Sequence, residues 1–246
     1  MVNTILTMTF AVTIGISLGV LGSGGSIVTL PVLVYIAGVP AKEAVGMSMA
    51  IVGATSLFGS FVHLRRGNVA VRAALIFSAT GMAGAFVGAT GTHFVSKRIL
   101  LLSFAGLMLV VGSFMLQGNR GMDRKSSCSI PRCLFVGFGV GLLTRFLGVG
   151  GGFLIVPALV LSAGLDTRLA SGTSLAVIAL NSTTGLLGRL RYTNMDWGLL
   201  AQFLFCALVG ILAGIALAHR LNENILRRVF AAALIVLALV IGGLNL

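Results

Sequence analysis

The chain has 246 residues, of which 57% are hydrophobic and only 9% are charged, and its mean hydropathy is +1.10. Soluble domains carry roughly a quarter charged residues, so this composition excludes them and predicts a multi-pass membrane protein. The formal net charge of +12 does not indicate nucleic-acid binding, because the basic residues form small clusters between apolar runs. The N-terminal segment lacks the basic start of a signal peptide, so we expect a retained first helix.

Ten apolar segments follow one another, and most have about the 20 residues that a helix needs to cross a bilayer. Two of them, 26–38 and 152–163, are shorter and give only about 20 Å of helix. We therefore expect an all-α membrane protein with about eight to ten membrane segments. The full set is 3–21, 26–38, 43–64, 69–92, 98–117, 133–147, 152–163, 168–190, 197–218 and 225–245.

Each short segment follows a glycine-rich break, at Gly22–Ser26 and at Gly148–Gly152. Glycine allows positive φ angles, so one helix can stop there and another can begin at once. Such breaks expose backbone groups that a bilayer cannot satisfy, and they are expected where they line a cavity or face protein. Short, Gly/Pro-interrupted segments at matching places in two halves of a chain indicate a transporter's binding site.

The two halves match at a single offset of 126 residues, without a gap, over roughly ninety residues. The offset pairs Gly22 with Gly148 and Pro31 with Pro157. It predicts one integrated membrane domain with a first repeat at 1–117, a cytoplasmic linker loop at 118–132 and a second repeat at 133–246. Each repeat has five segments, an odd number, so the second repeat is expected to be inverted.

The distribution of basic residues favours this inverted arrangement over a parallel one. Inversion places eleven Lys and Arg residues inside and five outside, whereas a parallel arrangement gives nine and seven. Both termini are then expected to face outward.

The five acidic residues all fall in loops or at segment ends, so carboxylate proton relays are not expected. No HExxH motif, P-loop or nucleophile elbow is present, so we expect no enzyme activity, no catalytic residue, no metal and no cofactor. The three cysteines match no usual metal-binding spacing and are expected to be incidental thiols.

The remaining features suit an anion. A helix that starts after a glycine break directs its unpaired N–H groups and positive dipole end at the break. The alternative is that the glycines only allow helices to pack closely. Arg145 has no acid in its segment, so its expected partner is a substrate anion; the alternative is that it snorkels to the headgroups.

Hydroxyl and amide groups on the third segment of each half could replace part of an anion's hydration shell. The alternative is that they bond their own backbone or a neighbouring helix. The candidate substrate-binding residues are Gly22, Ser23, Gly24, Gly25, Ser26, Ser48, Ser56, Arg145, Gly148, Gly150, Gly151, Gly152, Ser174, Asn181 and Ser182.

The duplicated G-x-G-G-[GS] break, the proline six residues after Gly25 and after Gly151, and the small-polar helix that follows resemble the TauE/SafE sulfite exporter (TSUP) family. The resemblance extends over nearly the whole chain. It implies a carrier of the bacterial inner membrane for sulfite, sulfoacetate or another organosulfonate. The first break departs from the second by having Ser23 and Ser26 in place of Val149 and Gly152.

We expect the direction of transport to be export and its mechanism to be alternating access. A dianion that leaves a cytoplasm held at −100 mV gains about 4.6 kcal/mol, whereas uptake needs a coupling ion. An anion channel and an uptake carrier for a related sulfur compound are the alternatives. The expected partners are a small anion and the lipid bilayer, with no nucleic acid, and the oligomeric state stays open.

Overall fold

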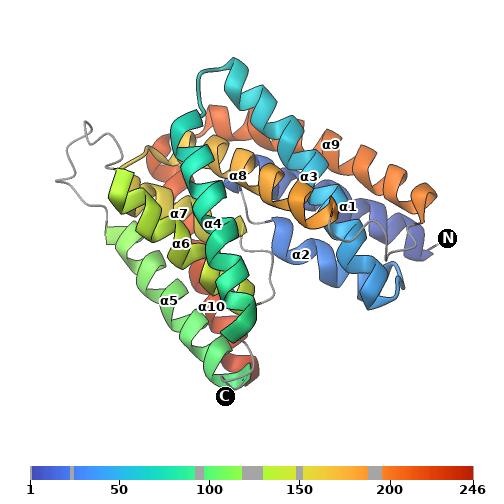
Figure 1. Cartoon of the computed structure of the whole chain (residues 1–246). Helices are drawn as coiled ribbons and strands as arrows, with labels where there is room; N and C mark the ends of the chain where they lie inside the picture. The colour runs from blue at the N-terminus through green and yellow to red at the C-terminus, as the bar shows by residue number, and fades with distance from the viewer. Residues whose placement is uncertain are drawn as a thin grey trace.

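The computed structural model describes residues 2–22, 25–91, 97–117, 130–147, 152–187 and 196–245, and within these ranges it consists of helices and short connections, without strands (Figure 1). Every helix falls on one of the expected apolar segments, and α7 covers the same residues as the expected segment 152–163. The all-α expectation is therefore confirmed.

The first half contains α1 (Val2–Leu21), α2 (Gly25–Pro31), the π-helical turn η1 (Val32–Ile36), α3 (Ala41–Arg65), α4 (Val71–Gly91) and α5 (Lys97–Gln117). The second half contains α6 (Ile130–Leu147), α7 (Gly152–Ala163), α8 (Thr167–Leu187), α9 (Trp197–Arg220) and α10 (Glu223–Asn245).

Two of the described helices, α3 and α9, are long and apolar enough to cross a membrane. Shorter apolar stretches cover Ile5–Leu21, Val71–Val87 and Cys133–Leu142. Large apolar side chains such as Phe86, Phe135 and Phe205 are exposed on the outside of the bundle. An exterior of this kind suits hydrocarbon rather than water.

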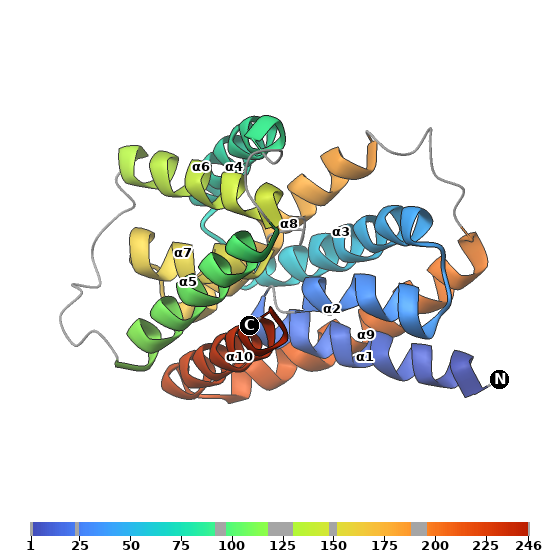
Figure 2. The ribbon, with the colours of Figure 1, turned by 90° about the horizontal axis from the view of Figure 1, so that it is seen from below.

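Four helix pairs build the bundle: α1 lies along α9, α4 along α6, α3 along α8 and α5 along α10 (Figure 2). Glycines let the backbones of two of these pairs touch. A β-carbon on Gly15 of α1 would overlap the carbonyl oxygen of Ala207 on α9, and one on Gly141 of α6 would overlap that of Gly81 on α4. Small residues at such contacts are the usual means of close helix association in membranes.

The helices α3 and α8 run antiparallel through the middle of the molecule. Their glycine contacts fix the register, because Gly53 of α3 faces Ser182 of α8, while Gly172 of α8 faces His63 of α3. Residue numbers therefore rise along α3 as they fall along α8.

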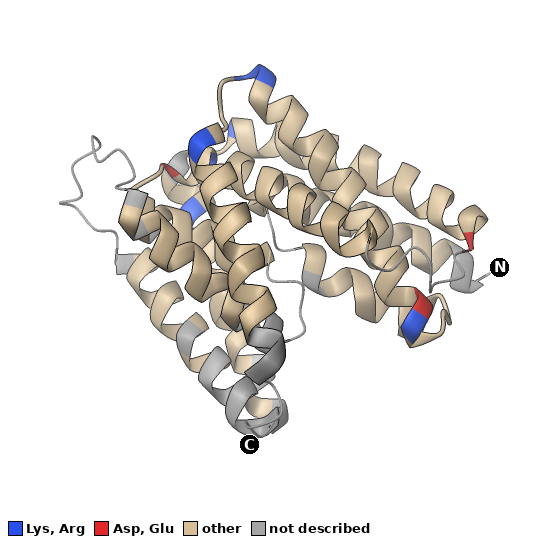
Figure 3. Ribbon diagram, viewed as in Figure 1, with Lys and Arg blue, Asp and Glu red and all other residues tan. Residues whose placement is uncertain are grey.

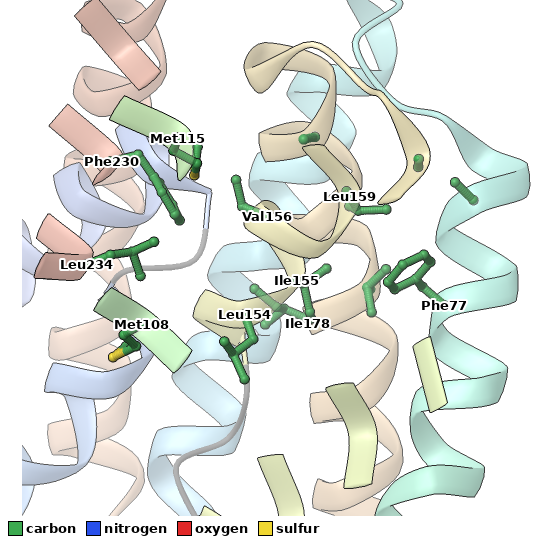
Figure 4. Packing of buried hydrophobic residues seen from close by; sticks show 14 of the residues in the cluster. Phe77, Met108, Met115, Leu154, Ile155, Val156, Leu159, Ile178, Phe230 and Leu234 are labelled. Atoms are coloured by element: carbon green, nitrogen blue, oxygen red, sulfur yellow. The ribbon is translucent and has the colours of Figure 1, made fainter. Parts of the chain in front are cut away.

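The short helix α7 lies inside the main apolar core. Its residues Leu154, Ile155, Val156 and Leu159 are buried together with side chains from α4, α5, α8 and α10 (Figure 4). A helix that is apolar on all sides is expected to be enclosed by protein. The core residues that Figure 4 labels outside α7 are Phe77, Met108, Met115, Ile178, Phe230 and Leu234.

The short segment of the first half differs from the expected single helix, because its α-helix ends at Pro31 and a π-helical turn follows. Proline has no N–H to donate to the preceding turn. The N–H of Ala37 reaches back five residues to the carbonyl of Val32, at 3.0 Å.

Candidate functional site

The first glycine break begins at Gly22, where the backbone turns out of α1 with φ of +73°. The N–H of Gly22 still donates to the carbonyl of Leu18, at 2.8 Å, so Gly22 closes the helix in the left-handed conformation that glycine tolerates best. The chain then starts α2 at Gly25, where a β-carbon would lie 2.5 Å from the carbonyl oxygen of Ile14. The start of α2 is thus packed directly on α1. Ser23 and Gly24 lie outside the described residues.

The first break rests on α8, a helix of the other half. The hydroxyl of Ser174 lies 3.0 Å from the carbonyl oxygen of Gly22 and 2.7 Å from that of Ser171, so it can donate to either. A β-carbon on Gly22 would lie 2.7 Å from the Cα of Ser171 and would overlap its hydroxyl. Ser171 Oγ is itself buried, without a hydrogen-bond partner among the described residues.

The two short helices begin side by side. A β-carbon on Gly152, the first residue of α7, would lie 2.9 Å from the hydroxyl oxygen of Ser26 on α2 and 2.8 Å from Cδ1 of Ile178. Any larger residue at position 152 would therefore have to displace these neighbours. Gly148, Gly150 and Gly151 lie outside the described residues, so the contact between Ser26 and Gly152 is where the structure brings the predicted breaks together.

The predicted polar residues of α3 have different surroundings. Ser48 donates to the carbonyl of Val45 in its own helix, at 2.9 Å. Ser56 is fully buried, and its hydroxyl has no hydrogen-bond partner in the described part of the chain. A buried hydroxyl without a partner is uncommon and costly, so Ser56 is the more informative of the two.

On α8, Asn181 and Ser182 lie at helix contacts. Asn181 Oδ1 accepts a hydrogen bond from Ser78 of α4 at 2.9 Å, which leaves its amide nitrogen as a donor. Ser182 lies against Gly53, whose β-carbon would be 3.1 Å from Cβ of Ser182. Arg145 belongs to α6, but its side chain lies outside the described residues, so its role stays a prediction.

A second polar region, which the sequence reasoning missed, lies where α3 ends, α8 begins and α9 ends. The rings of His63 and His219 stack with their centroids 6.1 Å apart. Arg168 donates to the carbonyl of Leu221 at 2.9 Å and approaches that of Ala218 at 3.4 Å. Most described Lys and Arg residues gather toward this end of the bundle (Figure 3). The available signal was a histidine inside an apolar helix, just before Arg65 and Arg66.

The cysteine expectation needs one correction. Cys133 is buried and disulfide-bonded, so it is not an incidental thiol, whereas Cys206 is free. Among the described residues, no group of three His, Cys, Asp or Glu side chains could hold a metal ion.

Comparison with known proteins gives a consistent result. The family model described as "Sulfite exporter TauE/SafE" matches residues 7–241. A "Probable membrane transporter protein" of Xylella fastidiosa (strain 9a5c) is 35% identical over 237 residues, which cover 92% of this chain and 90% of the relative. The "Probable membrane transporter protein YdhB" of Bacillus subtilis (strain 168) is 27% identical over 220 residues, covering 87% and 90%. No solved structure matches the chain.

Proposed function

We propose, because the chain belongs to the TauE/SafE sulfite exporter family, that this membrane transporter is a secondary carrier that moves a small sulfur oxyanion across the bacterial inner membrane. The proposed substrates are sulfite, sulfoacetate or another organosulfonate, and the proposed direction is export by alternating access. The observation that carries the proposal is the contact between Ser26 and Gly152, where two short helices begin together.

Two adjacent helix starts favour an anion for an electrostatic reason. The first turn of each helix has backbone N–H groups without helical partners and carries the positive end of the helix dipole. Both positive ends would stabilise a negative charge that lies between them. The hydroxyl of Ser26 and the unpartnered hydroxyl of Ser56 add donors of the kind that a sulfur oxyanion accepts.

The repeats are proposed to be inverted, and the antiparallel course of α3 and α8, which correspond at the offset of 126 residues, supports this. Gly15 of α1 contacts Ala207 of α9. At the offset of 126 residues, Gly15 corresponds to Gly141 and Ala207 to Gly81, and these two residues are also in contact. The contact between Gly210 and Val12 becomes that between Gly84 and Phe138 in the same way. The pairs α1–α9 and α4–α6 are then mates under a two-fold relation between the halves.

The proposed orientation puts the basic end in the cytoplasm and both termini outside. Arg65 and Arg66 lie at the end of α3, Arg72 at the start of α4, Arg168 at the start of α8 and Arg220 at the end of α9. The start of α3 carries Lys42. Cytoplasmic loops have an excess of Lys and Arg, which supports this choice. Export of a dianion from a cytoplasm at −100 mV is favourable by about 4.6 kcal/mol and needs no coupling ion.

Flux of labelled sulfite and sulfoacetate from proteoliposomes tests the proposal. We expect wild type to carry at least one of them, and Gly152→Leu to slow it at least about tenfold, because the larger side chain fills the space beside Ser26. Gly139→Leu is the matched control, since a β-carbon on Gly139 meets no atom within 4 Å. Arg145→Gln tests the predicted anion contact.

Two results would contradict the proposal. One is the absence of flux for every sulfur oxyanion tested, and the other is unchanged flux in Gly152→Leu. Single-channel currents in planar bilayers, far above the turnover of a carrier, would favour the anion channel instead. Flux that requires an inward cation gradient and runs inward would favour the uptake carrier.

A further inference from the structure

We propose that His63, His219, Arg66 and Arg168 form a second oxyanion-binding site, at the basic end of the bundle and apart from the contact between α2 and α7. The four residues come from the end of α3, the turn that follows it, the start of α8 and the end of α9. The anion is inferred to be the transported one, and that identification rests on the proposed function.

The first support is a set of buried nitrogen atoms without hydrogen-bond partners in the described part of the chain. His63 is only 1% exposed, and neither of its ring nitrogens has a hydrogen-bond partner among the described residues. The same holds for Nε2 of His219 and Nε of Arg168, both of which are buried atoms. Most buried polar atoms in proteins are hydrogen-bonded, so several unpaired nitrogen atoms at one place indicate a missing ligand.

The second support is the sign of the surrounding charge. The charged groups that act on His63 are His219, Arg66 and Arg168, which are all basic. His219 likewise has Arg66 and Arg168 as its charged neighbours. Basic groups that gather in a place with little water attract an anion strongly.

Capping of helix ends does not explain the cluster fully. Cations are favourable at helix C-termini, and the terminal nitrogen of Arg168 indeed donates to the carbonyl of Leu221 at the end of α9. This contact holds the guanidinium in place but leaves its Nε unpaired. It also gives nothing to the ring nitrogens of His63, whose single N–H therefore needs another acceptor.

The donors match the chemistry of a sulfur oxyanion. Each neutral histidine donates one hydrogen bond, and Nε of Arg168 donates another. A sulfite ion or a sulfonate group presents three acceptor oxygens on one sulfur atom, so one anion could satisfy all three side chains. The exposed Arg66 would add charge at the mouth of the site. A site here would collect the anion on the basic side before it reaches Ser26 and Gly152.

Equilibrium binding of labelled sulfite to the purified full-length protein in nanodiscs tests this proposal. Gly152→Leu serves as the background, because it fills the proposed site between α2 and α7. In this background we expect saturable binding to persist, and added His63→Leu to weaken it at least about tenfold, as expected for the loss of a hydrogen bond to a charged group. His63→Gln, which keeps a donor, should bind with intermediate affinity.

Arg66→Gln and Arg65→Gln provide a matched pair that does not disturb the core. Both side chains are exposed, but the guanidinium of Arg65 lies over the ring of Phe61, 4.5 Å from its centroid. We expect Arg66→Gln alone to weaken sulfite binding, by several-fold and more strongly at low salt. Equal effects of the two substitutions, or unchanged binding in His63→Leu, would overturn the proposal. Those results would leave the flux measurements untouched, whereas wild type without flux would contradict only the proposed function.

Discussion

The hydroxyl of Ser174 lies 3.0 Å from the carbonyl oxygen of Gly22, a residue 152 positions earlier in the chain. This hydrogen bond ties the first glycine break to the helix that crosses the middle of the molecule. Both groups are buried, so loss of the hydroxyl leaves the carbonyl without its side-chain donor.

Ser174→Ala should therefore destabilise the protein by about 1–3 kcal/mol, the usual cost of leaving a buried polar group unpaired. Ser113→Ala is the control, because the exposed Ser113 donates only to the carbonyl of Val110 in its own helix. The measurement is the midpoint of thermal unfolding in detergent. Equal midpoints for the two variants would show that the bond to Gly22 contributes nothing to stability.

Gly22→Ala should impair transport much more than Gly38→Ala. Both glycines have positive φ angles, +73° and +71°, so alanine strains the backbone at either position by about 1–2 kcal/mol. A β-carbon on Gly22 also collides with Ser171, whereas one on Gly38 meets no atom within 4 Å. Flux in proteoliposomes should fall at least about tenfold in Gly22→Ala and stay near wild type in Gly38→Ala. Similar flux in both variants would contradict a role for packing at the break.

Gly141→Ala and Gly139→Ala lie two residues apart in α6 and should have opposite effects on stability. A β-carbon on Gly141 overlaps the carbonyl of Gly81 and would force α6 away from α4, whereas one on Gly139 enters open space. We expect Gly141→Ala to lower the yield of folded protein and its unfolding midpoint. Gly139→Ala should be neutral or stabilising by up to about 1 kcal/mol, because alanine favours the helix. Size-exclusion profiles and thermal unfolding measure both variants.

Asn181→Asp should slow anion flux at least about tenfold. The substitution keeps the oxygen that accepts from Ser78 at 2.9 Å, but it replaces the amide donor with a negative charge. Ser78→Ala removes the same hydrogen bond from the other side and should leave flux nearly unchanged. If both variants slow flux equally, Asn181 contributes through its bond to α4 and not through an anion.

Hydropathy and glycine spacing predict the helices of this protein well. The segment 152–163 coincides with α7, because a dozen apolar residues bounded by glycines leave little freedom in where a helix begins and ends. The positive φ at Gly22 follows from the same reasoning, since the break needs a residue without a β-carbon. The segment 26–38 is expected to form one short helix that contains Pro31. In the structure the α-helix ends at Pro31, which has no N–H to donate, and π-helical hydrogen bonding follows.

The contacts of the site could not be predicted in the same way. The offset between the halves says which residues correspond, but it does not say which residues meet. Ser26 approaches Gly152, and Ser174 approaches Gly22, through contacts between the two halves that the offset does not specify. His63 has no histidine at its corresponding position, Arg189, so the repeat does not indicate a role for it.

The glycine contacts between α1 and α9, and between α6 and α4, also limit how the molecule can move. At these contacts, a carbonyl oxygen of one helix occupies the position that a β-carbon on the glycine of its partner would take. Sliding one helix along the other would bring that oxygen into collision with the next Cα atom or side chain. We therefore expect each pair to move as one rigid piece. Because each pair takes one helix from either half of the chain, we expect the proposed alternating access to move two interlocked helix pairs against each other and not the two halves.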